Sequence, residues 1–125
     1  MKMLLIVTAV LEAIAGAAFL LIPAIAFSTL LGLPLDTPAG LVAGRLAGAA
    51  IIGLAIACWQ ARNSEKSGAA LGIVAAMMFY NLAVSLIIVW GGLRLGIQHP
   101  LMWPVMVAHA ALGSWCLIVL KLAAR

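Results

Sequence analysis

Four long apolar stretches dominate this sequence and leave few folds open to it. They cover residues 3–25, 39–59, 69–91 and 101–120, and none contains more than one charged side chain. A helix needs about 20 apolar residues to cross the hydrocarbon core of a bilayer. Each stretch is therefore long enough to span a membrane, and the connections are short enough for neighbouring spans to run in opposite directions. We predict an all-α, membrane-embedded four-helix bundle with up-down-up-down topology.

The composition fits lipid better than water as the surrounding solvent. Hydrophobic residues make up 67% and charged residues 8% of the chain, whereas a soluble domain averages about 45–50% apolar and about 25% charged residues. We therefore treat residues 1–125 as a single integral membrane domain whose main partner is the lipid bilayer. The first stretch also imitates a signal peptide, but it is too long for one and carries Glu12, so we expect it to be retained. Residues 27–29 and 32–38 should form a loop.

The basic residues indicate orientation rather than a ligand. Seven Lys and Arg against three Asp and Glu give a net charge of +4. No segment combines clustered basic residues with aromatic ones, which argues against nucleic-acid binding. If the N-terminus is inside, only Arg94 lies outside, and the basic residues that face the cytoplasm are Lys2, Arg62, Lys66, Lys121 and Arg125. The positive-inside rule then predicts that both termini are cytoplasmic.

Each predicted span carries one strongly polar side chain away from its ends. At a rise of about 1.5 Å per residue, these side chains lie roughly 9–19 Å below the outer ends of their helices. They are Glu12, Arg45, Asn81 and His109. Charged groups at such depth are costly, and their default interpretation is functional. The long Arg45 side chain can reach toward Glu12, so we expect the four residues to meet in one ligand-binding polar centre.

A structural role stays open for each of these residues. Glu12 and Arg45 would also serve as a buried ion pair that only fixes helix packing. Asn81 is of a type that commonly hydrogen-bonds between membrane helices. His109 is either a packed, neutral imidazole or a group that exchanges protons near neutral pH. The second span adds a ridge of small residues that favours close helix packing, namely Gly40, Gly44 and Gly48.

We expect no metal ion and no cofactor. One helix face carries Met102, Met106, His109 and Cys116, and sulfur ligands favour Cu(I). Met and Cys are also ordinary fillers of apolar cores, and Cys116 lies about 10 Å along the helix from His109. The sequence contains no nucleophile–base pair, metal motif or nucleotide-binding loop. It therefore indicates no catalytic residue and argues against an enzyme.

Short motifs on all four spans carry a resemblance to a known family. They are Leu11-Glu12-Ala13, Arg45-Leu46-Ala47-Gly48, Tyr80-Asn81, and Trp103-Pro104 with His109-Ala110. In these motifs and their order, the chain resembles the small bacterial four-helix membrane proteins that are broadly DoxX-like. The resemblance implies a four-helix fold in the bacterial inner membrane, and it transfers no activity.

A second resemblance is to the small multidrug-resistance transporters, four-helix proteins with an acid early in the first helix. Glu12 followed by Gly16 is similar to that pattern. Two features depart from it. Arg45 would offset the charge of the acid, and the one-sided distribution of basic residues argues against a dual-topology protein.

Our leading hypothesis is a membrane protein that binds a small amphiphilic or lipophilic molecule at the polar centre, with its transport as an extension. Glu12 and Arg45 would hold the headgroup. Asn81 would hydrogen-bond to it, and His109 would exchange a proton. One alternative is a non-catalytic subunit that docks on a membrane partner, or on a second copy of itself, through the glycine ridge. A further alternative is a proton-coupled transporter of the small multidrug type.

Single cysteines introduced into two connections test the predicted orientation. We expect Ser64→Cys to react only from the cytoplasmic side and Asp36→Cys only from outside, because the basic residues hold their end of the bundle in the cytoplasm. The measurement is labelling with a membrane-impermeant maleimide in intact cells and in inverted vesicles, with the unsubstituted chain as background. Labelling of both positions from both sides would contradict a single orientation.

Overall fold

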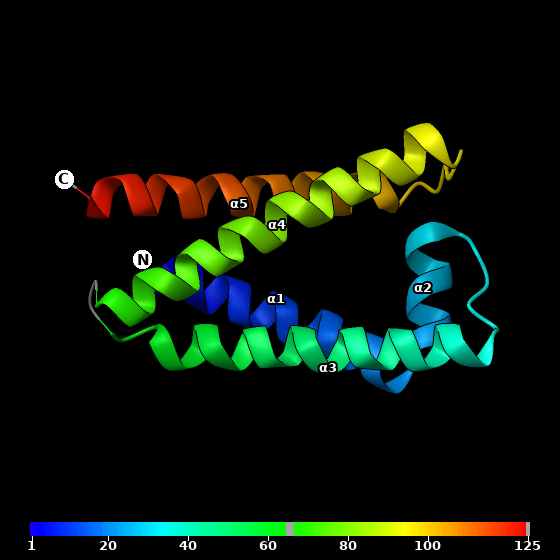
Figure 1. Ribbon diagram of the computed structural model, residues 1–125, viewed down its shortest axis with the longest axis horizontal. Helices are drawn as coiled ribbons and strands as arrows, with labels where there is room; N and C mark the ends of the chain where they lie inside the picture. The colour runs from blue at the N-terminus through cyan, green and yellow to red at the C-terminus, as the bar shows by residue number, and fades with distance from the viewer. Residues whose placement is uncertain (65–66, 125) are drawn as a thin grey trace.

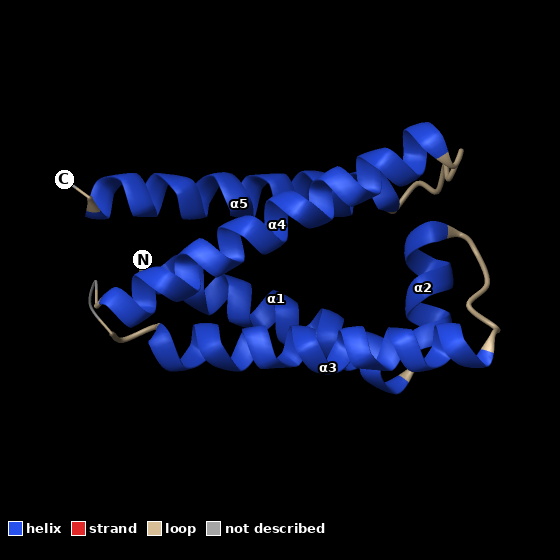
Figure 2. Ribbon diagram, viewed as in Figure 1, coloured by secondary structure: helices blue, strands red, loops and turns tan. Residues whose placement is uncertain are grey.

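Four long helices and one short helix make up the described part of the chain. The computed structural model describes residues 1–64 and 67–124. Its helices are α1 (Lys2–Leu21), α2 (Pro23–Leu31), α3 (Pro38–Ala61), α4 (Gly68–Arg94) and α5 (Met102–Ala123). All except α2 are long and apolar enough to cross a membrane. The predicted all-α class is confirmed, and Figure 2 shows helices and loops with no strand among the described residues.

The long helices begin where the sequence supplies caps. The hydroxyl oxygen of Thr37 accepts a hydrogen bond from the Gly40 backbone N–H at 3.1 Å, just before α3. Ser67 caps α4 in the same way, accepting from the Ala70 N–H at 3.3 Å. Such caps satisfy N–H groups that have no partner within the helix. With these caps, α3 begins at Pro38 and α4 at Gly68, each one residue before the predicted spans 39–59 and 69–91.

The long helices form two antiparallel pairs, α1 with α3 and α4 with α5. The pairs meet at the end of the molecule that holds both termini, and they diverge toward the other end (Figure 1). At the closed end, buried apolar side chains from all four long helices form the core: Leu4, Leu5, Ala9, Cys58, Ala61, Ala70, Val74, Met77, Leu112 and Cys116. Lys66 and Arg125, two of the basic residues used to predict the orientation, lie outside the described residues.

The backbones of α1 and α3 lie in direct contact. A Cβ atom added at Gly48 would lie 2.7 Å from the carbonyl oxygen of Gly16, and one added at Gly16 would lie 2.9 Å from the backbone nitrogen of Ile52. At Gly44, an added Cβ would lie 2.9 Å from the Cβ of Pro23. Small residues allow this approach, as they do in other membrane helix pairs. Most of the predicted glycine ridge therefore packs inside the chain.

The first helix breaks at Ile22, which corrects the predicted first span of residues 3–25. Ile22 has φ −131° and ψ 54°, outside the helical region, and the following Pro23 has no N–H to continue the helix. The short α2 then starts at Pro23, so residues 27–29, which we predicted as part of a loop, are helical. Gly32 ends α2 with a φ of 68°, a left-handed conformation that glycine adopts without strain.

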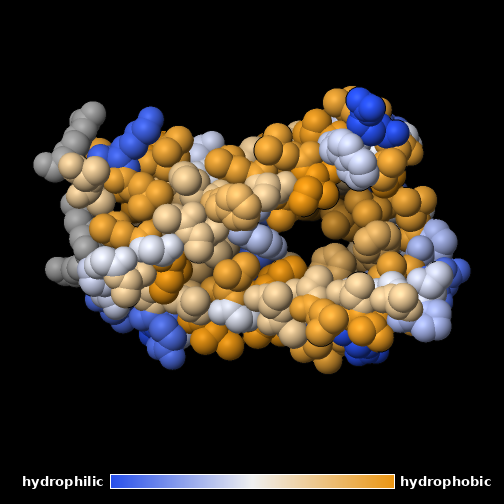
Figure 3. All heavy atoms as spheres, in the orientation of Figure 1, coloured by the Kyte–Doolittle hydropathy of each residue, from blue (hydrophilic) through white to orange (hydrophobic). Residues whose placement is uncertain are grey.

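The helix α2 crosses from one helix pair toward the other at the diverging end (Figure 1). Its end contacts the connection between α4 and α5, since a Cβ atom added at Gly32 would lie 2.7 Å from Cδ2 of His99. The two pairs are thus joined at the core and again near α2. Between these two contacts they border an opening, which the space-filling view shows clearly (Figure 3). The opening runs across the long helices, so it faces the sides of the bundle rather than its ends.

Substituting Gly48 tests the backbone contact between α1 and α3. We expect Gly48→Ala to lower the free energy of unfolding by about 1–3 kcal/mol, because the methyl group would force the two backbones apart. The matched control is Gly53→Ala on the same helix, where an added Cβ meets nothing within 4 Å. This control should be neutral, or stabilising by up to about 1 kcal/mol. The measurement is equilibrium unfolding in mixed micelles, and equal losses in both variants would contradict the packing.

Candidate functional site

Glu12, Tyr80 and His109 come from three different helices and form one polar cluster, which we call the Glu–Tyr–His group. The Tyr80 hydroxyl on α4 donates a hydrogen bond to Oε2 of Glu12 on α1, with an oxygen–oxygen distance of 3.3 Å. The Tyr80 ring also lies 6.0 Å, centroid to centroid, from the tilted imidazole ring of His109 on α5. Within the described residues, the Tyr80–Glu12 bond is the one hydrogen bond that links the two helix pairs.

The Glu–Tyr–His group lies where the apolar core ends. Glu12, Tyr80 and His109 are each three residues, or nearly one helical turn, from a core residue of the same helix, namely Ala9, Met77 and Leu112 respectively. In each helix the member of the group lies on the side of that core residue that is farther from the closed end. Beyond this level the helix pairs diverge (Figure 1), and the space-filling view shows the opening there (Figure 3). Pale-blue atoms of hydrophilic residues are visible at the inner edge of the opening in Figure 3. The group therefore lies between a packed half of the molecule and an open half.

His109 has one ring nitrogen committed to its own helix. Its Nδ1 atom lies 2.9 Å from the carbonyl oxygen of Val105. Because a carbonyl oxygen can only accept, Nδ1 must carry the proton of this bond. No described residue forms a hydrogen bond with Nε2, and the side chain is half-buried. In the neutral ring, Nε2 is therefore a free acceptor at the level of the group.

Asn81 follows Tyr80 on α4 and lies in the contact between α4 and α5. Its side chain is fully buried, and its Nδ2 donates to a backbone carbonyl one turn earlier at 2.8 Å. Its Oδ1 atom is buried without a hydrogen-bond partner. The Ser85 hydroxyl, 3.0 Å from the Asn81 carbonyl oxygen and 3.1 Å from that of Met106, ties the two helices together. Asn81 thus serves helix packing and still holds one unused acceptor.

Arg45 does not join the Glu–Tyr–His group, which corrects the expected pairing with Glu12. Its Nη1 donates to the carbonyl oxygen of Leu20 at 2.8 Å, and its side chain is exposed. Leu20 lies in the last turn of α1, where the break before Pro23 stops the next turn from covering this oxygen. Arg45 therefore caps the end of α1. Glu12 has no ion pair with a basic side chain in the described part of the chain.

The glycine ridge offers little surface to a partner. Gly48 faces the backbone of α1, and Gly44 faces Pro23 at the start of α2. Gly40 is closest to the side chains of Thr37 and Leu35 in the preceding connection. The face that the alternative hypothesis assigns to docking another membrane protein is thus largely occupied within the chain itself.

Sequence analysis did not single out Tyr80 as a site residue. Tyr80 is the sole tyrosine of the chain and lies near the middle of α4. Tyr in membrane helices is enriched at the interfaces, where its hydroxyl reaches water, and a buried Tyr hydroxyl usually needs a partner. The position of Tyr80 in the middle of a span, at a depth similar to that of Glu12, was therefore the signal that could have identified it as a site residue.

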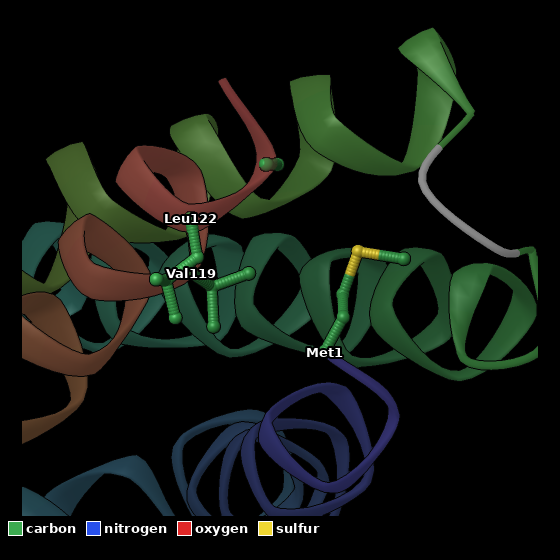
Figure 4. Close-up of a pocket in the computed structure, with 4 residues that line it drawn as sticks. Met1, Val119 and Leu122 are labelled. Atoms are coloured by element: carbon green, nitrogen blue, oxygen red, sulfur yellow. The ribbon is translucent and has the colours of Figure 1, made fainter. Parts of the chain in front are cut away.

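The rest of the described fold offers neither a metal centre nor a second polar pocket. Among the described residues, no three or more His, Cys, Asp or Glu side chains are placed to hold a metal ion. A pocket of about 200 Å³ lies between the start of α1 and the end of α5 (Figure 4). Its lining residues are Met1, Val119, Leu122 and Ala123. With no polar side chain in that lining, the pocket offers no headgroup contact like that of the Glu–Tyr–His group.

Comparison with known proteins gives no relative from which a role can be transferred, since no protein-family model, no curated protein and no solved structure matches the chain. The geometry of the Glu–Tyr–His group is therefore the basis for assigning a function.

Double-mutant cycles distinguish the observed contacts of Glu12 from the expected ones. Glu12→Gln and Tyr80→Phe should be coupled by about 0.5–3 kcal/mol, because the two side chains share a hydrogen bond. Glu12→Gln and Arg45→Met should be additive within about 0.5 kcal/mol, because Arg45 bonds to a different group. The measurement is the free energy of unfolding of each single and double variant in mixed micelles. Strong coupling to Arg45 with none to Tyr80 would show that this assignment of contacts is wrong.

Proposed function

We propose that this multi-pass membrane protein binds a small amphiphilic or lipophilic molecule in the opening between its helix pairs. The observation that carries the proposal is the Glu–Tyr–His group at the inner end of an opening that faces sideways. In a bilayer, the sides of the bundle face lipid, so an apolar molecule can enter there without crossing water. Its polar head then meets Glu12, Tyr80 and His109, while its tail stays among apolar side chains. Small-molecule sites commonly combine such apolar walls with a few converging polar groups.

We further propose that the protein is DoxX-like and resides in a bacterial inner membrane with its termini in the cytoplasm. The motifs around Glu12, Arg45, Tyr80 and His109 support the family proposal. Both termini lie at one end of the molecule (Figure 1), and the basic residues Lys2 and Lys121 occur there. This arrangement agrees with the charge distribution on which the orientation rests.

Photolabelling of the full chain in lipid nanodiscs tests binding. We expect ten-carbon probes that carry a diazirine near the headgroup to label residues close to Glu12, Tyr80 and His109. Three headgroups are compared, namely an alcohol, an amine and a carboxylate. At least one probe should give labelling that saturates and that an excess of the unlabelled compound displaces. The measurement is peptide mapping by mass spectrometry.

Two matched variants locate the binding. His109→Leu removes one of the three polar side chains of the group, so it should lower the saturable labelling. Ser114→Ala removes a polar group from an exposed position of the same helix, and it should leave the labelling unchanged. Labelling that never saturates with any probe, and that spreads evenly over the outer apolar surface, would refute the proposed site.

A further inference from the structure

The Glu–Tyr–His group contains an acid whose charge nothing in the described chain balances. Glu12 is the only acidic residue in the spanning helices, and its side chain is 3% exposed. Its hydrogen-bond partner is the neutral hydroxyl of Tyr80, and Arg45 is engaged at Leu20 instead. Carboxyl groups in the membrane usually pair with a base or line a functional site. The described chain supplies no base, so the ionised form of Glu12 would take its countercharge from a ligand.

The unused hydrogen-bonding capacity of the site consists of acceptors. The carboxyl group of Glu12 has two oxygens, and Tyr80 donates to one of them. Nε2 of His109 has no partner among the described residues, and Oδ1 of Asn81, the residue after Tyr80, is buried without one. The Tyr80 hydroxyl is a donor that is already used. A ligand that fits this site therefore brings hydrogen-bond donors, whereas an anionic headgroup would bring more acceptors and a like charge.

The two aromatic rings favour a cation in particular. The Tyr80 and His109 rings lie 6.0 Å apart at an interplanar angle of 57°. The Tyr80 hydroxyl is also 3.3 Å from Oε2 of Glu12, so a headgroup near Glu12 is close to the Tyr80 ring. Cations are attracted to the face of an aromatic ring, and the attraction grows when water is excluded. A neutral hydroxyl gains neither this attraction nor the charge pairing with Glu12.

Resting on the proposed function, we infer that the ligand is a lipophilic amine in its protonated form. Its ammonium group donates to the Glu12 carboxyl group beside the Tyr80 ring. Its hydrocarbon part lies in the opening, which it enters from the bilayer. Arg45, which would attract an anionic headgroup, instead holds the broken end of α1 outside this site.

Competition among three unlabelled compounds with the same tail tests the inference. Decylamine, decanol and decanoate are compared, at equal membrane concentrations, for displacement of whichever photoprobe labels the site saturably. We expect decylamine to compete at least about tenfold more strongly than decanol, because its ammonium group adds a charge pairing with Glu12 and an attraction to the Tyr80 ring that a neutral hydroxyl lacks. Decanoate should compete least. Glu12→Gln should abolish the preference for the amine, while Asp36→Asn, which removes an acid from an exposed connection, should preserve it.

The outcomes separate this inference from the proposal beneath it. Equal competition by decanol and decylamine, or a preference for decanoate, would overturn the amine as ligand while leaving the binding site in place. A preference for the amine that survives in Glu12→Gln would also overturn it. The ranking in the wild-type protein decides the question even if Glu12→Gln fails to fold. Absence of saturable labelling with all three photoprobes would instead refute the proposed function.

Discussion

The Arg45 guanidinium group meets the carbonyl oxygen of Leu20 at the point where α1 ends. In hydrocarbon an unpaired carbonyl has no water to bond with, so a break in a spanning helix persists only where another group satisfies the freed oxygen. This break allows α2 to leave the direction of α1 and cross the diverging end of the bundle (Figure 1). The Arg45 contact therefore supports one wall of the opening. It also keeps Arg45, the one basic residue within α3, away from Glu12.

Packing within the helix pairs and packing between them differ in kind, and this difference creates the opening. Within the first pair, Gly16 and Gly48 bring two backbones together over the middle of the helices. Between the pairs, the buried apolar cluster lies at the end that holds the termini, where the two pairs meet (Figure 1). Polar side chains follow immediately where that core stops. A polar group buried without partners is costly, so the Glu–Tyr–His group fits the boundary of the core better than its interior.

The sequence predicted the four long helices well because apolar length is a property of each helix alone. It predicted contacts between helices poorly. Helical phase and depth identified the faces that carry Glu12 and Arg45, but they do not determine which face turns inward after two helices pack. The close approach at Gly48 turns that part of α3 toward α1 and leaves the Arg45 side chain exposed. The break at Ile22 was equally hidden, because Pro23 marks an end to α1 without showing that helix resumes at once in α2.

Tyr80 connects the chemistry of the site to the arrangement of the helix pairs. Its hydrogen bond to Glu12 is 3.3 Å long, beyond the usual range of about 2.5–3.0 Å for an O–H donor and an oxygen acceptor. A charged donor forms a shorter and stronger bond to a carboxyl oxygen, so the proposed amine would bond to Glu12 more strongly than Tyr80 does. Because this bond is the one hydrogen bond that joins the two pairs in the described chain, a ligand at the proposed site would act directly on a contact between them.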